Sequence, residues 1–361
     1  MKKNDITILL TFIFFLIGPT IIYWFVKTKM DLNNYENRIL YSRPEFTFVN
    51  ITSFPSDYEK YFNDKLPFKN EIRKIRSLIN YKVFNISSNE RVIIGKNNWF
   101  FYDSSLVGDG DSISDYRNTT LFSSNDVNDI IAKMYNVKEQ LKQKNIQLYV
   151  IVPPNKENVY ADHLEKIISK NKSRKSRTEY LIDKINETGN LSIIYPKTEL
   201  IEGREQYETY FKYDSHWNSY GAYLGVEKLM KEIDKDYKIE FENIDYINYD
   251  GDLAKMNLMA NKLYSKEPDV KFMSNISANC NNLEINYCES SSSRNETIML
   301  IGDSFSNSMI DYLTKIYKRS VFVERGNYNF NLIETYKPNI IVYEVVERQL
   351  DALRTIDILI N

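Results

Sequence analysis

The sequence predicts an α/β protein with a three-layer α/β/α architecture, in which helices cover both faces of a central, mainly parallel sheet. Short apolar segments alternate along the 361 residues with segments of helical periodicity. Apolar strands this short, when they alternate with helices, are typical of parallel strands buried on both faces. A long uncharged stretch near the N-terminus adds one transmembrane helix before this domain.

The elements are expected in the following order. Residues 91–102 and 146–154 read as β segments, and an amphipathic helix with Asn125 or Asp126 as its cap lies between them. Further helices are predicted at 176–189, 218–234, 308–317 and near 347–359, and further strands at 191–196, 296–303, 320–324 and 339–346. The expected divisions are a membrane anchor at 1–27, a membrane-proximal helical segment at 28–90 and the α/β domain at 91–361.

Residues 6–26 form the predicted anchor. They contain no charged residue and would extend about 31 Å as a helix, enough to cross a bilayer. Tyr23 and Trp24 suit a membrane interface, and the absence of a small-residue cleavage site favours an uncleaved anchor. The lysines nearly balance, Lys2 and Lys3 against Lys27 and Lys29. We expect the short N-terminus inside and the body of the protein outside the cell membrane. A buried core helix is the alternative.

Charge and cysteine content exclude several classes of function. Lys and Arg number 47 and Asp and Glu number 49, so no basic field is available to gather nucleic acid. Cys280 and Cys288, in a polar segment, could form a disulfide or remain free thiols. Two cysteines and two histidines give no zinc-type cluster, and neither a metal nor a cofactor is expected.

Three segments follow predicted strands, where ligands bind in open α/β sheets. The first, "GDSFSN" (302–307), places Ser304 between a strand and a helix. There Ser304 could be a nucleophile whose backbone amide helps to stabilise an oxyanion. Alternatively, Asp303 or Ser304 could only cap the helix.

The second segment, "YDSHWNSYGA", places Asp214 and His216 two residues apart. In extended or loop backbone, such residues face the same side. The Asp214 carboxylate could then orient the ring of His216, leaving its other nitrogen as a base for Ser304. A surface histidine beside an aspartate is the alternative. His163 has no such partner and is predicted to be a solvated surface residue.

The third segment, "IVPPNKENVY", contains Asn155 and Lys156, which could orient substrate or support an oxyanion, or could simply form a turn. Trp217, next to His216, is a further candidate for substrate binding. After the last strand, Glu344, Glu347 and Arg348 are expected to form a structural ion pair.

Several of these motifs together resemble one family. "GDSFSNSM" and "DSHWNSYGA" are similar to the SGNH hydrolase-like domain of the alginate O-acetyltransferase family, which includes AlgX, AlgJ and the related DHHW proteins. "IIGKNNWFFY", "FNDKLPFKNEI" and "VPPNKENVY" agree with it, so the resemblance covers residues 35–350. In this family the Asp/His pair precedes the serine, as it does here.

The resemblance implies that Ser304 is the nucleophile, His216 the base and Asp214 its partner. It implies acetyl transfer to hydroxyls of an exopolysaccharide or cell-wall glycan outside the membrane, through an acetyl-serine. The acetyl group would arrive from a membrane-bound O-acyltransferase (MBOAT) partner. A carbohydrate esterase and a non-catalytic cell-surface scaffold are the alternatives, and neither requires a cofactor.

Overall fold

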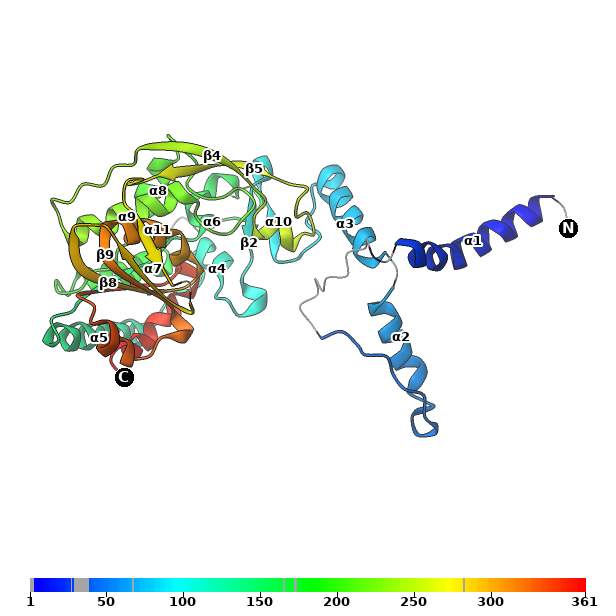
Figure 1. Cartoon of the computed structure of the whole chain (residues 1–361), viewed down its shortest axis with the longest axis horizontal. Helices are drawn as coiled ribbons and strands as arrows, with labels where there is room; N and C mark the ends of the chain where they lie inside the picture. Colours follow the sequence, from blue (N-terminus) through cyan, green and yellow to red (C-terminus); the bar gives the residue numbers. More distant parts are fainter. Residues whose placement is uncertain are drawn as a thin grey trace. The chain divides into compact units, whose positions relative to one another are not determined.

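The computed structural model describes residues 3–26, 28, 39–66, 68–164, 166–171, 174–281 and 283–361. These residues divide into two compact units. The first comprises Met1–Ser88 with Met256–Met259, and the second comprises Asn89–Lys255 with Ala260–Asn361. Figure 1 shows the helices and strands of both units in chain order.

The first unit is helical. It contains α1 (Lys3–Val26), a 3-10 turn at Phe48–Asn50, α2 (Phe54–Asp64) and α3 (Lys69–Ile79), which continues into a π turn at Asn80–Phe84. Asn257 belongs to this unit because its side-chain oxygen accepts hydrogen bonds from the Ser87 hydroxyl and the Ser88 amide, both at 3.0 Å.

The prediction of a membrane-spanning helix is not supported. A helix does form at Lys3–Val26, but among the described residues no helix is both long enough and apolar enough to cross a bilayer. Lys2, Lys27 and Lys29, on which the expected orientation depended, lie outside the described residues.

The second unit is built on a six-stranded sheet. Its strands lie in the order β3 (Gln147–Ile151), β10 (Ile340–Glu344), β8 (Arg294–Gly302), β9 (Tyr317–Glu324), β7 (Ile285–Ser290) and β6 (Ala278–Cys280). The first four strands are parallel. The last two are antiparallel additions, so the sheet is mixed, with the predicted parallel arrangement in its first four strands.

Helices cover both faces of this sheet, as the three-layer prediction requires. Alternate residues of β8 point to opposite cores: Ile298 and Leu300 to one, Met299 and Ile301 to the other. The first core includes residues of α9 (Ser219–Ile233) and α11 (Asn307–Ile316). The second includes residues of α5 (Ser124–Gln143), α7 (Arg177–Asn186) and the 3-10 segment Glu347–Leu359. Burial on both faces explains why these strands are apolar throughout.

Smaller elements complete the unit. Two hairpins stand apart from the main sheet: β1 (Val92–Ile94) with β2 (Phe100–Tyr102), and β4 (Asn243–Tyr249) with β5 (Ser265–Lys271). The short helices are α4 (Ser112–Arg117), α6 (Lys156–Val159), α8 (Lys197–Gly203), α10 (Asp252–Met256) and α12 (Asn331–Tyr336). Short 3-10 turns lie at Lys96–Asn98, Ser105–Val107, Ala161–His163, Ser304–Ser306 and Arg325–Asn327.

Some predicted elements differ in detail. Ser123, not Asn125 or Asp126, caps α5, because its hydroxyl accepts the Asp126 amide in a capping box. Residues 191–196 form no strand: only Ile194 pairs, with Ile151, and Pro196 has no amide to extend a ladder. The segment with the two cysteines contains strands β6 and β7, and Cys280 and Cys288 lie opposite each other and form a disulfide.

Candidate active site

Ser304 lies directly beyond the carboxyl end of β8, at the first position of the 3-10 turn Ser304–Ser306. Gly302 makes this turn possible, because a Cβ there would come within 2.4 Å of Glu344 Oε2 and 2.9 Å of Ser306 Cβ. Asp303, not Ser304, caps the turn: its Oδ1 accepts the Phe305 amide at 3.0 Å. The Ser304 hydroxyl is therefore free of the capping role that its position allowed.

Asp303 fixes the position of Ser304. Its second carboxylate oxygen, Oδ2, accepts the Val346 amide at 2.9 Å and an N–H of Arg325 at 3.1 Å. Its own amide donates to Glu344 Oε2 at 2.8 Å. The residue before the serine is thus tied to the neighbouring strand β10 and to the turn after β9.

His216 joins Ser304 to Asp214. The Nε2 atom of His216 lies 2.7 Å from Ser304 Oγ, and its Nδ1 lies 2.7 Å from Asp214 Oδ1. An ionised carboxylate can only accept, so Nδ1 donates and Nε2 has the free lone pair that accepts the serine proton. Two neighbouring side chains, Asp214 and His216, thus form one continuous hydrogen-bonded chain with Ser304, 88 residues further along the sequence.

The Asp214 carboxylate is buried and accepts four hydrogen bonds. Oδ1 accepts the Nδ1–H and the backbone N–H of His216, and Oδ2 accepts the Asp252 amide at 2.8 Å and the Tyr249 hydroxyl at 3.2 Å. Burial opposes its charge, but the hydrogen bonds and the nearby imidazole outweigh burial and lower the pKa of Asp214 well below its usual range. Asp214 is therefore an anion across the physiological pH range.

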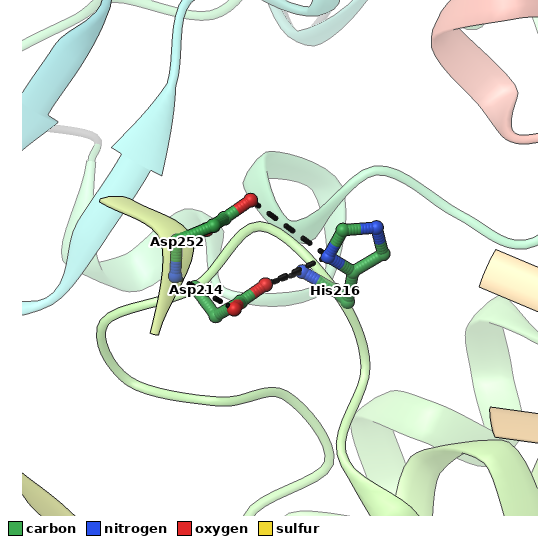
Figure 2. A group of neighbouring side chains, drawn as sticks. All are labelled: Asp214, His216 and Asp252. Atoms are coloured by element: carbon green, nitrogen blue, oxygen red, sulfur yellow. Dashed lines mark hydrogen bonds and ion pairs between the residues drawn. The ribbon is translucent and has the colours of Figure 1, made fainter. Parts of the chain in front are cut away.

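Asp252 is a second carboxylate against the same ring (Figure 2). Its Oδ2 lies 3.8 Å from His216 Nδ1, and its two oxygens accept the amide and hydroxyl of Ser215, the residue between Asp214 and His216. Partial burial and the charge of Asp214 raise the pKa of Asp252 to about 6. In Figure 2 the Nε2 side of the ring points away from both carboxylates.

These two carboxylates determine the proton affinity of His216. Burial opposes the imidazolium, but the hydrogen bond from Nδ1 to Asp214 and the charges of Asp214 and Asp252 raise the pKa of His216 above its usual value. A base with a raised pKa binds a proton from serine more strongly while the serine attacks.

Gly251 allows the backbone of Asp252 to approach the loop that contains Asp214. It has φ +54°, and a Cβ would lie 2.1 Å from the carbonyl oxygen of Tyr213. The turn after β4 can therefore pack against the loop that contains Asp214. The sequence prediction missed Asp252 and Tyr249, although the Asp-Gly-Asp turn before a helix was visible at 250–252.

Asp214, His216 and Asp252 each bring one potential ligand atom to within 4.8 Å of the others, a spacing that could hold a metal ion. The donor set argues against that use, because Nδ1 of His216 has its proton directed at Asp214, and both aspartates accept backbone N–H groups. A metal at Nδ1 would have to displace that proton.

Lys156 is not directed at a substrate. It is buried, and burial lowers its pKa to about 8. Its three ammonium N–H groups are shared among four backbone carbonyl oxygens at 2.6–3.0 Å, those of Phe100, Phe211, Lys212 and Asp214. Lys156 therefore holds the Asp214 loop in place.

Trp217 and Asn155 are also buried. Trp217 Nε1 donates to the carbonyl of Phe305 at 3.0 Å, which joins the His216 loop to the Ser304 turn. The backbone N–H of Asn155 donates to Glu347 Oε2 at 2.7 Å, and the side-chain Oδ1 of Asn155 accepts the backbone N–H of Arg348 at 3.1 Å. Among the described residues, neither side chain contacts Ser304 by a hydrogen bond.

Two other predictions need correction. Arg348 forms its ion pair with Asp109, at 3.1 Å, rather than with Glu344 or Glu347. Glu344 is fully buried, and burial raises its pKa well above the usual value. His163 is not a solvated surface residue: only 11% of its side chain is exposed, and Nδ1 lies 2.9 Å from the carbonyl of Lys96.

A cavity of about 350 Å³ opens beside Ser304. Its lining comes from the β6–β7 hairpin, the start of α11 and the end of β9. The site thus combines an exposed serine, a base, an orienting carboxylate and adjoining space.

Comparisons with known proteins identify the family of this chain. A family model described as "SGNH hydrolase-like domain, acetyltransferase AlgX" matches residues 92–325, well over half of the chain. "Probable alginate O-acetylase AlgJ" of Pseudomonas fluorescens is 22% identical over 179 residues, which cover 48% of this chain and 41% of that protein. The protein of the same name from Pseudomonas syringae pv. tomato is 21% identical over 205 residues, covering 54% and 48%.

The chain thus spans less than half the length of these curated relatives. Among solved structures, Bacillus cereus PatB1 with a sulfonyl adduct gives a TM-score of 0.51 at 13% identity, covering 74% of this chain and 99% of that one. This likeness concerns the fold alone. The match over residues 92–325 shows that the chain belongs to the family of alginate O-acetyltransferase-like proteins with an SGNH hydrolase-like domain, typified by acetyltransferase AlgX.

Proposed function

We propose that the protein is an O-acetyltransferase that moves an acetyl group onto a hydroxyl of a polysaccharide through an acetyl-serine at Ser304. The observation that carries the proposal is the hydrogen-bonded chain Asp214–His216–Ser304, with both contacts of His216 at 2.7 Å. Membership of the AlgX-like family and the names of the AlgJ relatives support acetyl transfer as the reaction class.

The first half-reaction acetylates the serine. His216 Nε2 takes the proton of Ser304 as Oγ attacks the carbonyl carbon of an acetyl ester, and the same proton then passes to the leaving alcohol. The charge that develops on the carbonyl oxygen would meet the Ser304 amide, which at the first position of its turn has no acceptor within the turn.

The second half-reaction releases the acetyl group. A sugar hydroxyl gives its proton to His216 Nε2 and attacks the acetyl carbon, and Ser304 Oγ leaves and recovers that proton. Asp214, ionised throughout, keeps Nδ1 protonated and stabilises the imidazolium in both steps.

We place this reaction outside the cytoplasm. The Cys280–Cys288 disulfide supports an oxidising compartment. Acetyl-CoA is cytoplasmic, so the acetyl group would have to be relayed across the membrane, and a membrane-bound O-acyltransferase is the partner we propose for that relay.

A partition experiment tests the proposal against the esterase alternative. The full chain is supplied with an acetyl ester, with and without an oligosaccharide acceptor, and acetate and acetylated sugar are both quantified. We expect acetyl to move to sugar faster than to water. Release only as acetate, over a varied acceptor panel, would favour an esterase, because the same side chains would serve a water molecule equally well.

A further inference from the structure

The cavity beside Ser304 has a partly apolar wall and a charged mouth. Leu283, Ile310 and Phe322 supply apolar surface, and Asn286 and Asn307 supply amide groups. Its volume of about 350 Å³ lies at the small end of the range for small-molecule sites. Apolar surface with a few amides suits one sugar ring, which has a C–H face and hydroxyl edges.

Glu284 and Glu324 are two exposed carboxylates that both line this cavity. Ile285 of β7 pairs with Val323 of β9 at the end of an antiparallel ladder, and each glutamate is the next residue beyond that pair in its own segment. Like charges on neighbouring segments repel each other. A sequence that keeps two such charges without compensation breaks a local rule, and that is expected at functional positions.

No positive charge offsets this pair in the described part of the chain. Among the described lining residues none is basic, and neither glutamate has an ion pair there. The nearest basic side chain along the chain, Arg325, is already bound to Asp303 at 3.1 Å. The mouth therefore presents two uncompensated negative charges to anything that approaches Ser304.

The hairpin that contributes one of these carboxylates is held by a covalent bond. The Cys280–Cys288 disulfide closes the β6–β7 hairpin, whose tip supplies Leu283, Glu284 and Asn286 to the cavity. A wall fixed in this way keeps its charge in a defined place relative to Ser304.

We propose that this cavity holds the acceptor sugar and that Glu284 and Glu324 select a sugar without a carboxylate. The expected order of preference is amino sugar, then neutral sugar, then uronate. Glu284 and Glu324 would repel a uronate carboxylate in the cavity and so exclude that acceptor, as like charges exclude wrong partners at specific interfaces. This inference rests on the proposed function and names the substrate class of the same site.

The test is equilibrium binding to the full-length Ser304→Ala protein, which cannot turn over. The probes are three oligosaccharides of equal length: one of N-acetylglucosamine, one of glucosamine and one of galacturonic acid. We expect the uronate to bind roughly tenfold or more weakly than the neutral probe at low salt, and glucosamine to bind at least as tightly. The difference should shrink as salt approaches about 1 M, where the Debye length is about 3 Å.

Variants that remove one negative charge show which residue weakens the binding of the uronate probe. Glu284→Gln and Glu324→Gln are made in the same Ser304→Ala background. In each variant the difference in affinity between the neutral and the uronate probe should become smaller. Each variant should also unfold at a slightly higher denaturant concentration, because the repulsion between the two carboxylates is relieved. Glu289→Gln is the matched control. It makes the same charge change on the same hairpin, but Glu289 lies opposite Arg319 in the strand register and does not line the cavity, so the difference in affinity should persist.

Equal binding of uronate and neutral probes at low salt, or an unchanged gap in both cavity variants, would overturn the inference. Its failure differs from failure of the proposed function, which would show as no acetyl on Ser304 in the wild-type protein. Discrimination among sugars by a protein that never acetylates would leave the cavity as a glycan site with a different activity.

Discussion

Ser304 Oγ lies 2.7 Å from His216 Nε2, although the two residues are 88 positions apart in the chain. A second bond spans the same separation, since Trp217 Nε1 donates to the carbonyl of Phe305 at 3.0 Å. The loop that contains His216 and the turn that contains Ser304 are thus tied together at two neighbouring points. Trp217, which was expected to bind substrate, joins these two segments.

Removal of the nucleophile or the base should abolish turnover. Ser304→Ala and His216→Ala should each reduce kcat by about 10⁴-fold or more with little loss of stability, because the Ser304 side chain is exposed and that of His216 is 24% exposed. Initial rates with an acetyl ester, together with circular dichroism and urea midpoints, check this. Residual activity within tenfold of wild type in Ser304→Ala would mean that another group reacts.

Asp214→Asn should leave measurable activity. The amide can offer its N–H to His216 Nδ1 and so favour the wrong tautomer, with the proton on Nε2, which reduces kcat by roughly 10³–10⁴-fold while the fold is retained. Asp214→Ala should also be strongly impaired, because the buried donors of Asp252 and Tyr249 lose their acceptor. A silent Asp214→Ala variant would contradict the assignment of this carboxylate.

Asp252→Asn should move the acidic limb of the kcat/KM profile to lower pH. The Asp252 carboxylate stabilises the imidazolium, so its removal lowers the pKa of His216, and His216 must be unprotonated to accept the serine proton. The pKa read from this limb belongs to the interacting group of Asp214, His216 and Asp252 rather than to one residue. Asp250→Asn, in the same turn, is the control and should leave the limb in place. A shift to higher pH would contradict this account.

Lys156→Met should destabilise the second unit by at least about 3 kcal/mol, because four backbone carbonyls, two of them in buried hydrogen bonds, lose their donor. Urea unfolding measures the loss, and Lys235→Met, at an exposed position, should have almost no effect. If Lys156→Met instead raised only the KM for the acceptor at unchanged stability, Lys156 would be a substrate-binding residue after all.

Reduction of the Cys280–Cys288 disulfide should lower the free energy of unfolding by about 2–3 kcal/mol, the value expected for a short closed loop. Urea midpoints with and without reductant test this. The Cys280→Ser/Cys288→Ser double variant should already have the lower midpoint and should not respond to reductant. A midpoint in the wild-type protein that reductant leaves unchanged would argue against a structural role.

The parallel part of the sheet could be predicted because its strands are buried on both faces. Residues 296–303 and 339–346, predicted as strands, coincide closely with β8 and β10, and the predicted helices 218–234 and 308–317 coincide with α9 and α11. The antiparallel edge could not be predicted, because β6 is short and polar and so reads as loop, whereas β3 at the opposite edge was predicted within 146–154.

The residues of the proposed triad were easier to find in the sequence than the residues that support them. Ser304, His216 and Asp214 are residue types whose chemistry is specific, and two of them lie in one short motif. Asp252 was missed because its contact depends on Gly251 and on a turn that only the fold brings close. Lys156 and Trp217 were predicted as substrate or oxyanion residues because a charge or an indole after a strand suggests ligand binding. The sequence does not show that both side chains are buried.

Time-resolved mass spectrometry of the full chain after mixing with an acetyl ester tests the central claim most directly. The account predicts an acetyl group on the peptide that contains Ser304 within the time of one turnover, its loss on addition of an oligosaccharide acceptor, and its absence in His216→Ala. Turnover at the normal rate with no acetyl group on Ser304 at any time would contradict it.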